Sequence, residues 1–315
     1  MLKLGVIGTN FVSDWLVEAA GLTEGVEVFA VYSRKDETGE AFARKHGIER
    51  VYTDLDAFFS SGIEAVYIAS PTYLHFTHAM AALEKGLHVL CEKPLIFRYA
   101  ECRILQEKAK EKGVVLLEAM RPAHDPALAL VKKSLAALGK ICRVSFEYCQ
   151  YSSRYDRFLA GEVMNAFTPE ISGGAIYDIG IYPLYWCVAL FGEPKTVSHE
   201  ATYLENGFEG GGCILLGYED FQATVTYSKI CDSVIPSVIA GEKGSLTLDK
   251  MQSPKTVRLI PRRGEGVPLD YTPAENNLVY ELADFLLVIG GEKNGYIRDT
   301  DALYRTLERV LFPEK

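Results

Sequence analysis

Short apolar runs alternate with amphipathic stretches over the first 120 residues, and this alternation limits most strongly how the chain can fold. The apolar runs are rich in Val, Ile and Leu. They are Leu2–Gly8, Val26–Ser33, Ala65–Ser70, His88–Cys91 and Val114–Glu118. Runs without polar alternation are typical of parallel strands that helices cover on both faces of the sheet.

Glycines mark the ends of the predicted helices between these runs. A glycine can adopt the left-handed backbone that closes a helix at its C-terminus. The helices expected on this basis are Thr38–His46 before Gly47, Thr77–Lys85 before Gly86 and Ala100–Lys112 before Gly113. Strand–helix–strand repetition of this kind predicts a doubly wound, parallel α/β domain of the Rossmann type over residues 1–120.

The pattern changes after Arg121-Pro122. Strands joined by Gly-containing turns are expected at Arg143–Gln150, Gly212–Gly217, Gln222–Lys229, Ser237–Ala240 and Ser245–Leu248. Helices are expected at Tyr182–Leu190, Glu275–Ile289 and Thr300–Leu311. Residues 121–315 are therefore predicted to form an α+β domain with a large, mostly antiparallel open sheet. Its C-terminal helices either stay with this domain or pack back on the first one, and the sequence does not decide between these alternatives.

Composition excludes several classes of protein. The 315 residues include 33 Lys and Arg against 42 Asp and Glu, and this acidic balance argues against nucleic-acid binding. No uninterrupted apolar run reaches the roughly 18–20 residues that span a membrane. The 7 cysteines are scattered and never spaced as C-x-x-C, so neither a disulfide framework nor a zinc site is expected. The first residues lack the pattern of an export signal, which predicts a cytoplasmic protein.

The first predicted strand leads into a degenerate dinucleotide-binding loop. Of the three glycines of G-x-G-x-x-G, only Gly8 is present, and Asn10 and Ser13 take the other two places. Asn tolerates left-handed backbone and Ser is small, so the geometry can survive. A helix N-terminus here would offer free N–H groups to a pyrophosphate. Gly8, Thr9, Asn10 and Phe11 are predicted to bind the cofactor, with an ordinary strand–helix turn as the alternative.

The end of the second predicted strand indicates which cofactor is bound. An NAD site usually places an acidic residue here for the ribose 2′-OH, whereas this chain has Ser33 and Arg34 and no acid before Asp36. A hydroxyl and a guanidinium can bind a 2′-phosphate. NADP is therefore favoured over NAD, although a solvated basic turn would have the same sequence.

Three further segments carry polar residues beside predicted strands and helices. They are Ala69-Ser70-Pro71-Thr72-Tyr73-Leu74-His75, Glu92-Lys93-Pro94, and the stretch from Gly173 to Tyr182 (GGAIYDIGIY). In this order and spacing they resemble the Gfo/Idh/MocA family (glucose–fructose oxidoreductase, inositol dehydrogenase and rhizopine-catabolism proteins) over essentially the whole chain. The E-K-P tripeptide and the G-G-x-x-x-D-x-G-x-[HY] stretch are its most specific parts.

The resemblance implies an oxidoreductase that acts on sugars, cyclitols and related alcohols with NAD(P). It implies a C-terminal substrate-binding domain whose open sheet mediates assembly into homodimers or homotetramers. Many members have His where this chain has Tyr182, so the chain is more similar to the branch with glucose–fructose oxidoreductase and the dimeric dihydrodiol dehydrogenases.

The catalytic residues that the resemblance implies are Lys93, Asp178 and Tyr182. The Lys93 ammonium can stabilise developing alkoxide charge, and the family's cis Lys–Pro bond would aim it into the cleft. Asp178 and Tyr182 are four residues apart, which places them on one face of a helical turn. A phenol, whose pKa is normally about 10, can exchange protons if a cation lowers it. Surface exposure of Lys93 and simple packing of Tyr182 are the alternatives.

The remaining site residues also rest on the resemblance. Further cofactor contacts are expected from Ser70, Pro71, Thr72, His75, Glu92 and Lys93. Substrate contacts are expected from Arg154, Tyr155 and Asn165. Thr72 replaces the commoner Asn, and His75 can equally be a structural histidine. His75 and His78 share helical spacing but lack a third ligand, so no metal is expected.

Three functions remain open at this point. The favoured one is a cytoplasmic NADP-dependent oxidoreductase that transfers hydride between nicotinamide and a small sugar, polyol or vicinal diol. An NAD-dependent inositol-type dehydrogenase is the second, and Ser33, Arg34 and Tyr182 count against it. A non-catalytic nucleotide-binding sensor is the third, and the joint presence of Lys93, Asp178 and Tyr182 counts against it.

Overall fold

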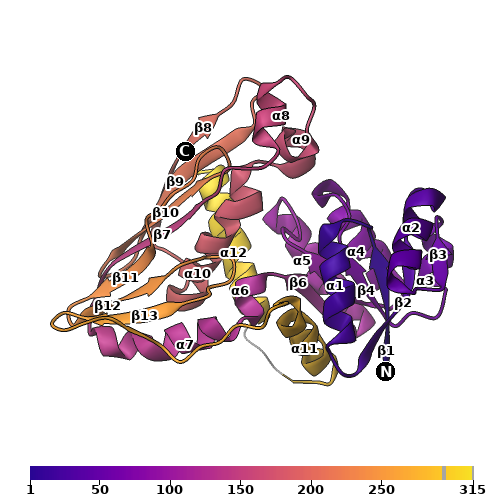
Figure 1. The fold of residues 1–315 in the computed structure, drawn as a ribbon, viewed down its shortest axis with the longest axis horizontal. Helices are drawn as coiled ribbons and strands as arrows, with labels where there is room; N and C mark the ends of the chain where they lie inside the picture. Colours follow the sequence, from indigo (N-terminus) through magenta and orange to yellow (C-terminus); the bar gives the residue numbers. More distant parts are fainter. Residues whose placement is uncertain (293–295, 314–315) are drawn as a thin grey trace. The chain divides into compact units, whose positions relative to one another are not determined.

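The computed structural model describes residues 1–292 and 296–313 and divides into two compact units (Figure 1). The first unit contains residues 1–120 and 274–292, and the second contains residues 121–273 and 296–313. The chain thus leaves the first unit after Met120, returns to it for one helix, and ends in the second unit.

A six-stranded sheet forms the centre of the first unit, with strand order β3-β2-β1-β4-β5-β6 and every pairing parallel. Its strands are β1 Leu2–Ile7, β2 Val26–Tyr32, β3 Arg50–Tyr52, β4 Ala65–Ile68, β5 His88–Glu92 and β6 Leu116–Ala119. This order is that of a doubly wound dinucleotide-binding domain. The predicted parallel α/β fold is confirmed, and only the three-residue edge strand β3 was not predicted.

Helices connect these strands (Figure 1). They are α1 Phe11–Gly21, α2 Asp36–His46, α3 Leu55–Phe59, α4 His75–Glu84 and α5 Tyr99–Lys112, with a 3₁₀ turn at Thr72–Leu74. Gly47 and Gly113 cap α2 and α5 in the left-handed conformation, with φ of 69° and 67°. Gly86 also has a positive φ of 78°, one residue after the cap of α4. α11 (Leu278–Ile289) belongs to this unit and contacts α1.

An eight-stranded sheet forms the second unit, with strand order β14-β13-β12-β11-β7-β10-β9-β8. The strands are β7 Ile141–Cys149, β8 Thr196–Tyr203, β9 Glu209–Gly217, β10 Gln222–Ser228, β11 Ser237–Gly241, β12 Gly244–Leu248, β13 Val257–Pro261 and β14 Val267–Pro268. All pairings are antiparallel except that of β7 with β10. The predicted mostly antiparallel sheet is confirmed. β8, β13 and β14 were not predicted. β8 and β14 are the edge strands and β13 lies beside β14, and all three have exposed residues and lack a clear apolar pattern.

The second unit contains a long apolar helical stretch together with several shorter helices. They are α6 Arg121–His124, α7 Pro126–Ser134, α8 Tyr155–Leu159, α9 Pro169–Ser172, α10 Ile181–Phe191 and α12 Tyr296–Leu311, with 3₁₀ turns at Leu135–Leu138 and Asn165–Phe167 and a π-helical turn at Ile176–Gly180. The helical stretch Pro169–Phe191 has the length and composition of a membrane span, but 83% of its apolar window is buried inside the protein. It therefore serves as the core helix of this unit, in contact with β7 and β10.

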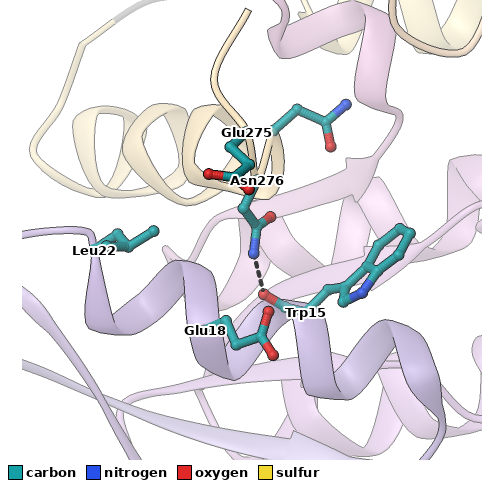
Figure 2. Close-up of a pocket in the computed structure, with 6 residues that line it drawn as sticks. Trp15, Glu18, Leu22, Glu275 and Asn276 are labelled. Carbon is teal, nitrogen blue, oxygen red and sulfur yellow. Dashed lines mark hydrogen bonds between the residues drawn. The ribbon is translucent and has the colours of Figure 1, made fainter.

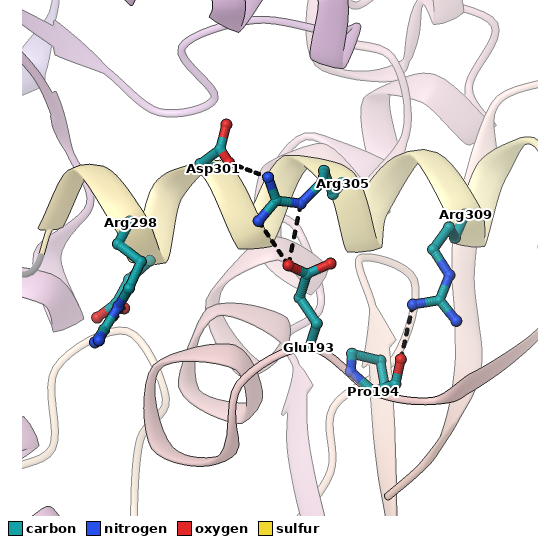
Figure 3. A network of polar contacts seen from close by, with 7 residues as sticks. Glu193, Pro194, Arg298, Asp301, Arg305 and Arg309 are labelled. Carbon is teal, nitrogen blue, oxygen red and sulfur yellow. Dashed lines mark hydrogen bonds and ion pairs between the residues drawn. The ribbon is translucent and has the colours of Figure 1, made fainter.

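Arginines on α12 fasten this helix to the turn that follows α10 (Figure 3). Arg305 donates through Nη2 and Nε to the Glu193 carboxylate at 2.6 and 3.0 Å, and it also pairs with Asp301 one turn away. Arg309 donates to the carbonyl oxygens of Pro194 and Lys195 at 2.7 and 2.8 Å. These bonds satisfy carbonyl groups beyond the end of α10 that no helix bond reaches.

Gly180 sets how closely the π-helical turn approaches β10. A Cβ atom at this position would lie 2.8 Å from the Tyr227 ring, closer than carbon atoms pack. We expect Gly180→Ala to lower the free energy of unfolding by about 1–3 kcal/mol through overpacking. Chemical denaturation measures this loss. Gly21→Ala on α1 is the matched control, because its added Cβ meets nothing within 4 Å; an equal effect of both variants would contradict the packing argument.

Candidate active site

The loop after β1 is built around Gly8. Its φ of +108° is accessible to glycine, and a Cβ there would lie 2.6 Å from the Ala69 carbonyl oxygen. β1 lies between β2 and β4 in the sheet, where the strand order reverses. Dinucleotides bind at this kind of position, outside the carboxyl ends of parallel strands. The close backbone approach at Gly8 fits such a cofactor.

Asn10 differs from the expectation for its place in the loop. Its backbone is extended, with φ of −90°, and not left-handed. Its side-chain oxygen accepts hydrogen bonds from the N–H groups of Val12 and Ser13 at 2.9 and 3.2 Å, and its amide nitrogen donates to the Ala69 oxygen at 2.8 Å. Asn10 therefore replaces the second glycine as the N-cap of α1, and two N–H groups expected to be free are already bonded.

Ser33 and Arg34 lie at the carboxyl end of β2, where residues that bind the 2′ position of the cofactor ribose are expected. Ser33 is buried, and its hydroxyl lies 2.6 Å from that of Thr38 at the start of α2. Arg34 is exposed. The pKa of His78 is lowered to about 4, mainly by burial and also by the nearby charges of His75 and Arg34. Arg34 is thus the side chain of this pair that remains available to a phosphate.

Polar contacts hold the Glu92–Lys93–Pro94 turn at the end of β5, where the Lys93–Pro94 bond is cis. Tyr67 donates to Glu92 at 2.6 Å. His75 is buried, with its ring nitrogens 2.8 Å from the carbonyl oxygens of Pro94 and Ser70. The turn that carries Lys93 is thereby tied to β4 by neighbouring side chains.

Glu118 holds the same turn from the other side. This carboxylate on β6 is buried and accepts the N–H of Leu95 at 2.8 Å. The sequence analysis did not single out Tyr67 or Glu118. A carboxylate inside an otherwise apolar strand (LLEA) was the available signal, because a buried charge requires a dedicated partner.

Ser70, Pro71 and Thr72 follow β4 and lead into the 3₁₀ turn before α4. The Ser70 hydroxyl lies 2.9 Å from His78 Nδ1. Together with the Gly8 loop, the end of β2 and the Lys93 turn, this segment lies at the carboxyl edge of the parallel sheet. The first unit therefore gathers all of its predicted cofactor residues at one edge.

Asp178 and Tyr182 belong to the second unit, on consecutive helical turns. Asp178 lies in the π-helical turn with 42% of its side chain exposed, and Tyr182 lies in the first turn of α10 with 3% exposed. The Tyr182 ring packs 5.8 Å from that of Tyr148 on β7. Tyr182 therefore has a fixed position, whereas the Asp178 carboxylate can reach a ligand.

The structure adds Lys229, which the sequence analysis missed. Its ammonium lies 2.8 Å from Oδ2 of Asp178, one of the predicted catalytic residues. Lys229 directly follows β10 and is buried. The available signal was the position of this lysine at the end of the predicted strand Gln222–Lys229.

Glu209 fixes the backbone from which Asp178 projects. The buried Glu209 carboxylate accepts the N–H of Ile176 at 3.0 Å and the hydroxyl of Tyr227 at 2.9 Å. His199 Nε2 lies 2.7 Å from the same hydroxyl. Burial raises the pKa of Glu209 to about 7, and these hydrogen bonds limit the rise.

The three predicted substrate residues occupy a separate segment of the second unit. Arg154 and Asn165 are exposed, and Tyr155 is partly buried in α8. The Tyr155 ring packs against Phe158 and Phe167, with centroids 6.1 and 5.4 Å away. This aromatic cluster continues to Phe208, so it reaches the surroundings of Lys229.

A surface pocket of about 410 Å³ lies beside α1 in the first unit (Figure 2). It is lined by Trp15, Glu18, Leu22, Glu275, Asn276 and Asn277. Asn276 donates to the Trp15 carbonyl oxygen at 2.8 Å and so fastens the start of α11 to α1. None of the candidate site residues lines this pocket. Within the described part of the chain, no group of three or more His, Cys, Asp or Glu is placed to hold a metal ion.

Family models match both parts of the chain. Residues 2–120 match an oxidoreductase family with an NAD-binding Rossmann fold, and residues 131–247 match the GFO/IDH/MocA C-terminal domain. The chain belongs to the Gfo/Idh/MocA family of oxidoreductases. As a member of this family it is an NAD(P)-dependent oxidoreductase, which confirms the predicted enzyme class.

Similar Gfo/Idh/MocA proteins cover nearly the whole chain. An uncharacterised oxidoreductase of Escherichia coli, YgjR, is 41% identical over 92% of this chain and 88% of its own. The scyllo-inositol 2-dehydrogenase (NADP(+)) IolU of Bacillus subtilis is 39% identical over 93% of this chain and 90% of its own. The crystal structure of KijD10, a 3-ketoreductase from Actinomadura kijaniata, has the same fold, with a TM-score of 0.88, 21% identity and coverage of 98% and 97%.

The raised pKa of Glu209 predicts a pH-dependent stability. The pKa of an unfolded glutamate is about 4.3, so folding favours the protonated form between that pH and about 7. The contribution of Glu209 to stability is fully present below the lower value and is lost as the pH rises through the upper one. We expect the free energy of unfolding to fall by on the order of 3 kcal/mol over this range relative to Glu209→Gln.

Urea denaturation at several pH values measures this difference. The exposed Glu205→Gln variant is the control, and its difference from wild type should not change in the same way. Parallel pH profiles of the wild type and Glu209→Gln would show that folding does not raise the pKa of Glu209.

Proposed function

We propose that this protein is an NADP-dependent oxidoreductase that transfers hydride between nicotinamide and a small sugar, cyclitol or vicinal diol. The Lys93 turn carries the proposal, because it is held by Tyr67, His75 and Glu118 at the sheet edge that also bears the Gly8 loop. A lysine held in this way is preorganised for chemistry beside the cofactor.

The names of similar proteins support this substrate class. IolU is a scyllo-inositol 2-dehydrogenase that uses NADP(+), at 39% identity. A trans-1,2-dihydrobenzene-1,2-diol dehydrogenase of Xenopus laevis is 28% identical over 81% of this chain. Both names describe ring compounds with neighbouring hydroxyl groups, and this class is proposed for the present enzyme.

In the proposed reaction, bound NADP supplies the acceptor and donor of hydride. In the phenolate form, Tyr182 takes the proton of the substrate hydroxyl during oxidation, and the resulting phenol returns this proton during reduction. The Lys93 ammonium stabilises the alkoxide that develops on the substrate. The exposed carboxylate of Asp178 orients the substrate hydroxyl. Gly8, Thr9, Phe11 and the Ser70–Thr72 segment are proposed to contact the cofactor.

The cofactor assignment predicts a charge-dependent preference for NADPH. We expect nicotinamide fluorescence titrations to give tighter binding of NADPH than of NADH. Arg34→Asp should weaken NADPH binding by about 100-fold, because a charge-assisted contact is lost and a repulsive charge is added. Arg44→Asp at the other end of α2 is the control, since it makes the same exposed charge change away from the loop. Preference for NADH would replace NADP by NAD in this proposal.

The mechanism predicts a separation of binding from turnover. With NADP⁺ and scyllo-inositol or a trans-diol as substrate, Lys93→Met should lower kcat by at least about 100-fold. Its dissociation constant for NADPH should stay within about threefold of the wild-type value, because Lys93 acts on the substrate. Lys85→Met, which removes an exposed lysine paired with Asp56, is the control and should leave both unchanged. Turnover at the wild-type rate in Lys93→Met would remove Lys93 from the mechanism.

A further inference from the structure

Lys229 is a buried cation in the second unit. Only 5% of its side chain is exposed, although lysine is among the residues that are buried least often. Burying an ammonium group is costly unless charges and hydrogen bonds compensate for the lost water. The groups around Lys229 that compensate for this lost hydration therefore indicate the role of the residue.

Two oxygen atoms accept from the Lys229 ammonium. One is the carbonyl oxygen of Ala166 at 2.8 Å, and the other is Asp178 Oδ2, also at 2.8 Å. The carbonyl belongs to the 3₁₀ turn Asn165–Phe167, whereas the carboxylate belongs to the π-helical turn. The ammonium thus bridges the segment of a predicted substrate residue, Asn165, and the proposed catalytic carboxylate.

Aromatic rings enclose the same ammonium. Its nitrogen lies 4.9 Å from the centroid of the Phe167 ring and 5.3 Å from that of Phe208. The negative faces of such rings attract a cation and exclude water from it. In this dry environment an ion pair is stronger and more directional than one at the surface.

The backbone of Lys229 is also fixed. Its N–H donates to the Gly210 oxygen of β9 at 2.8 Å, and its oxygen accepts the N–H of Ser152 at 2.9 Å. The ammonium is therefore held from both ends, by its backbone and by its hydrogen-bond partners. Asp178 keeps 42% of its side chain exposed, so the fixed partner lies behind a carboxylate that still faces solvent.

We propose that Lys229 is a positioning residue that holds the Asp178 carboxylate oriented toward the substrate hydroxyl. It does not touch the substrate and acts through Asp178 alone. This inference rests on the role of Asp178 in the proposed function. Misplacement of a substrate-orienting group by about 1 Å can lower turnover by roughly 100-fold, which sets the size of the expected effect.

A double-mutant cycle tests whether Lys229 acts through Asp178. Wild type, Lys229→Met, Asp178→Asn and the double variant are compared in the oxidation of scyllo-inositol with NADP⁺. We expect Lys229→Met to lower kcat by about 10- to 100-fold while the KM for NADP⁺ is unchanged. In the double variant, kcat should equal that of Asp178→Asn within about twofold. Lys140→Met, which breaks an exposed pair with Asp220, is the control.

The cycle separates failure of this inference from failure of the proposed function. The role of Lys229 would be overturned, and the proposed function would stand, in either of two outcomes. In one, the losses of kcat in the two single variants multiply in the double variant. In the other, Lys229→Met turns over at the wild-type rate while Asp178→Asn loses activity. Wild-type turnover in Asp178→Asn would remove Asp178 from the reaction and the role of Lys229 with it.

An activity-independent measurement tests the contact itself. In ¹H–¹⁵N spectra of lysine ammonium groups, the Lys229 signal is identified by its loss in Lys229→Met. It should shift in Asp178→Asn and remain in place in Asp220→Asn. An unchanged signal in Asp178→Asn would overturn the inference even if the enzyme turns over the substrate. Absence of turnover with every polyol and diol would instead overturn the proposed function, and the shift would still decide whether Lys229 holds Asp178.

Discussion

The parallel pairing of β1 with both β2 and β4 is the constraint on which the cofactor half of this enzyme depends. Parallel strands end at the same edge of a sheet, so the strand pairing alone brings the loops after β1, β2, β4 and β5 to one edge. Gly8 allows its loop to approach the end of β4 closely, because any side chain would collide with the Ala69 oxygen. The sheet brings the loops together, and one glycine lets them pack.

Buried polar groups then fix the details that the sheet leaves free. His75 and Glu118 bind backbone atoms on either side of Lys93, Glu209 binds the turn that carries Asp178, and Lys229 binds Asp178 itself. Each group would destabilise the fold if its partner were lost. These groups make the positions of the side chains proposed to react part of the folded state, which would reduce reorganisation during the proposed reaction.

Much of the first unit follows from sequence pattern. Its buried strands are continuous apolar runs, and Gly47 and Gly113 close their helices as expected. The edge strands β3, β8 and β14, and β13 next to β14, were not predicted, because exposed residues on these strands remove the apolar signal. The sequence placed Asn10 correctly in the loop but predicted the wrong backbone conformation for it. Its side chain caps α1 through the amide oxygen while the amide nitrogen donates to Ala69, and the position of Ala69 is not visible in the local sequence.

The sequence by itself determined the alternation of strands and helices, the cofactor loop and the residue types available for catalysis. These depend on neighbours along the chain, whose spacing is read directly. Only the tertiary structure decided which polar groups are buried together: Lys229 with Asp178 across 51 positions, and Glu118 with Leu95 across 23. Such pairings arise when strands and helices distant in sequence pack and exclude water, and no local pattern encodes them.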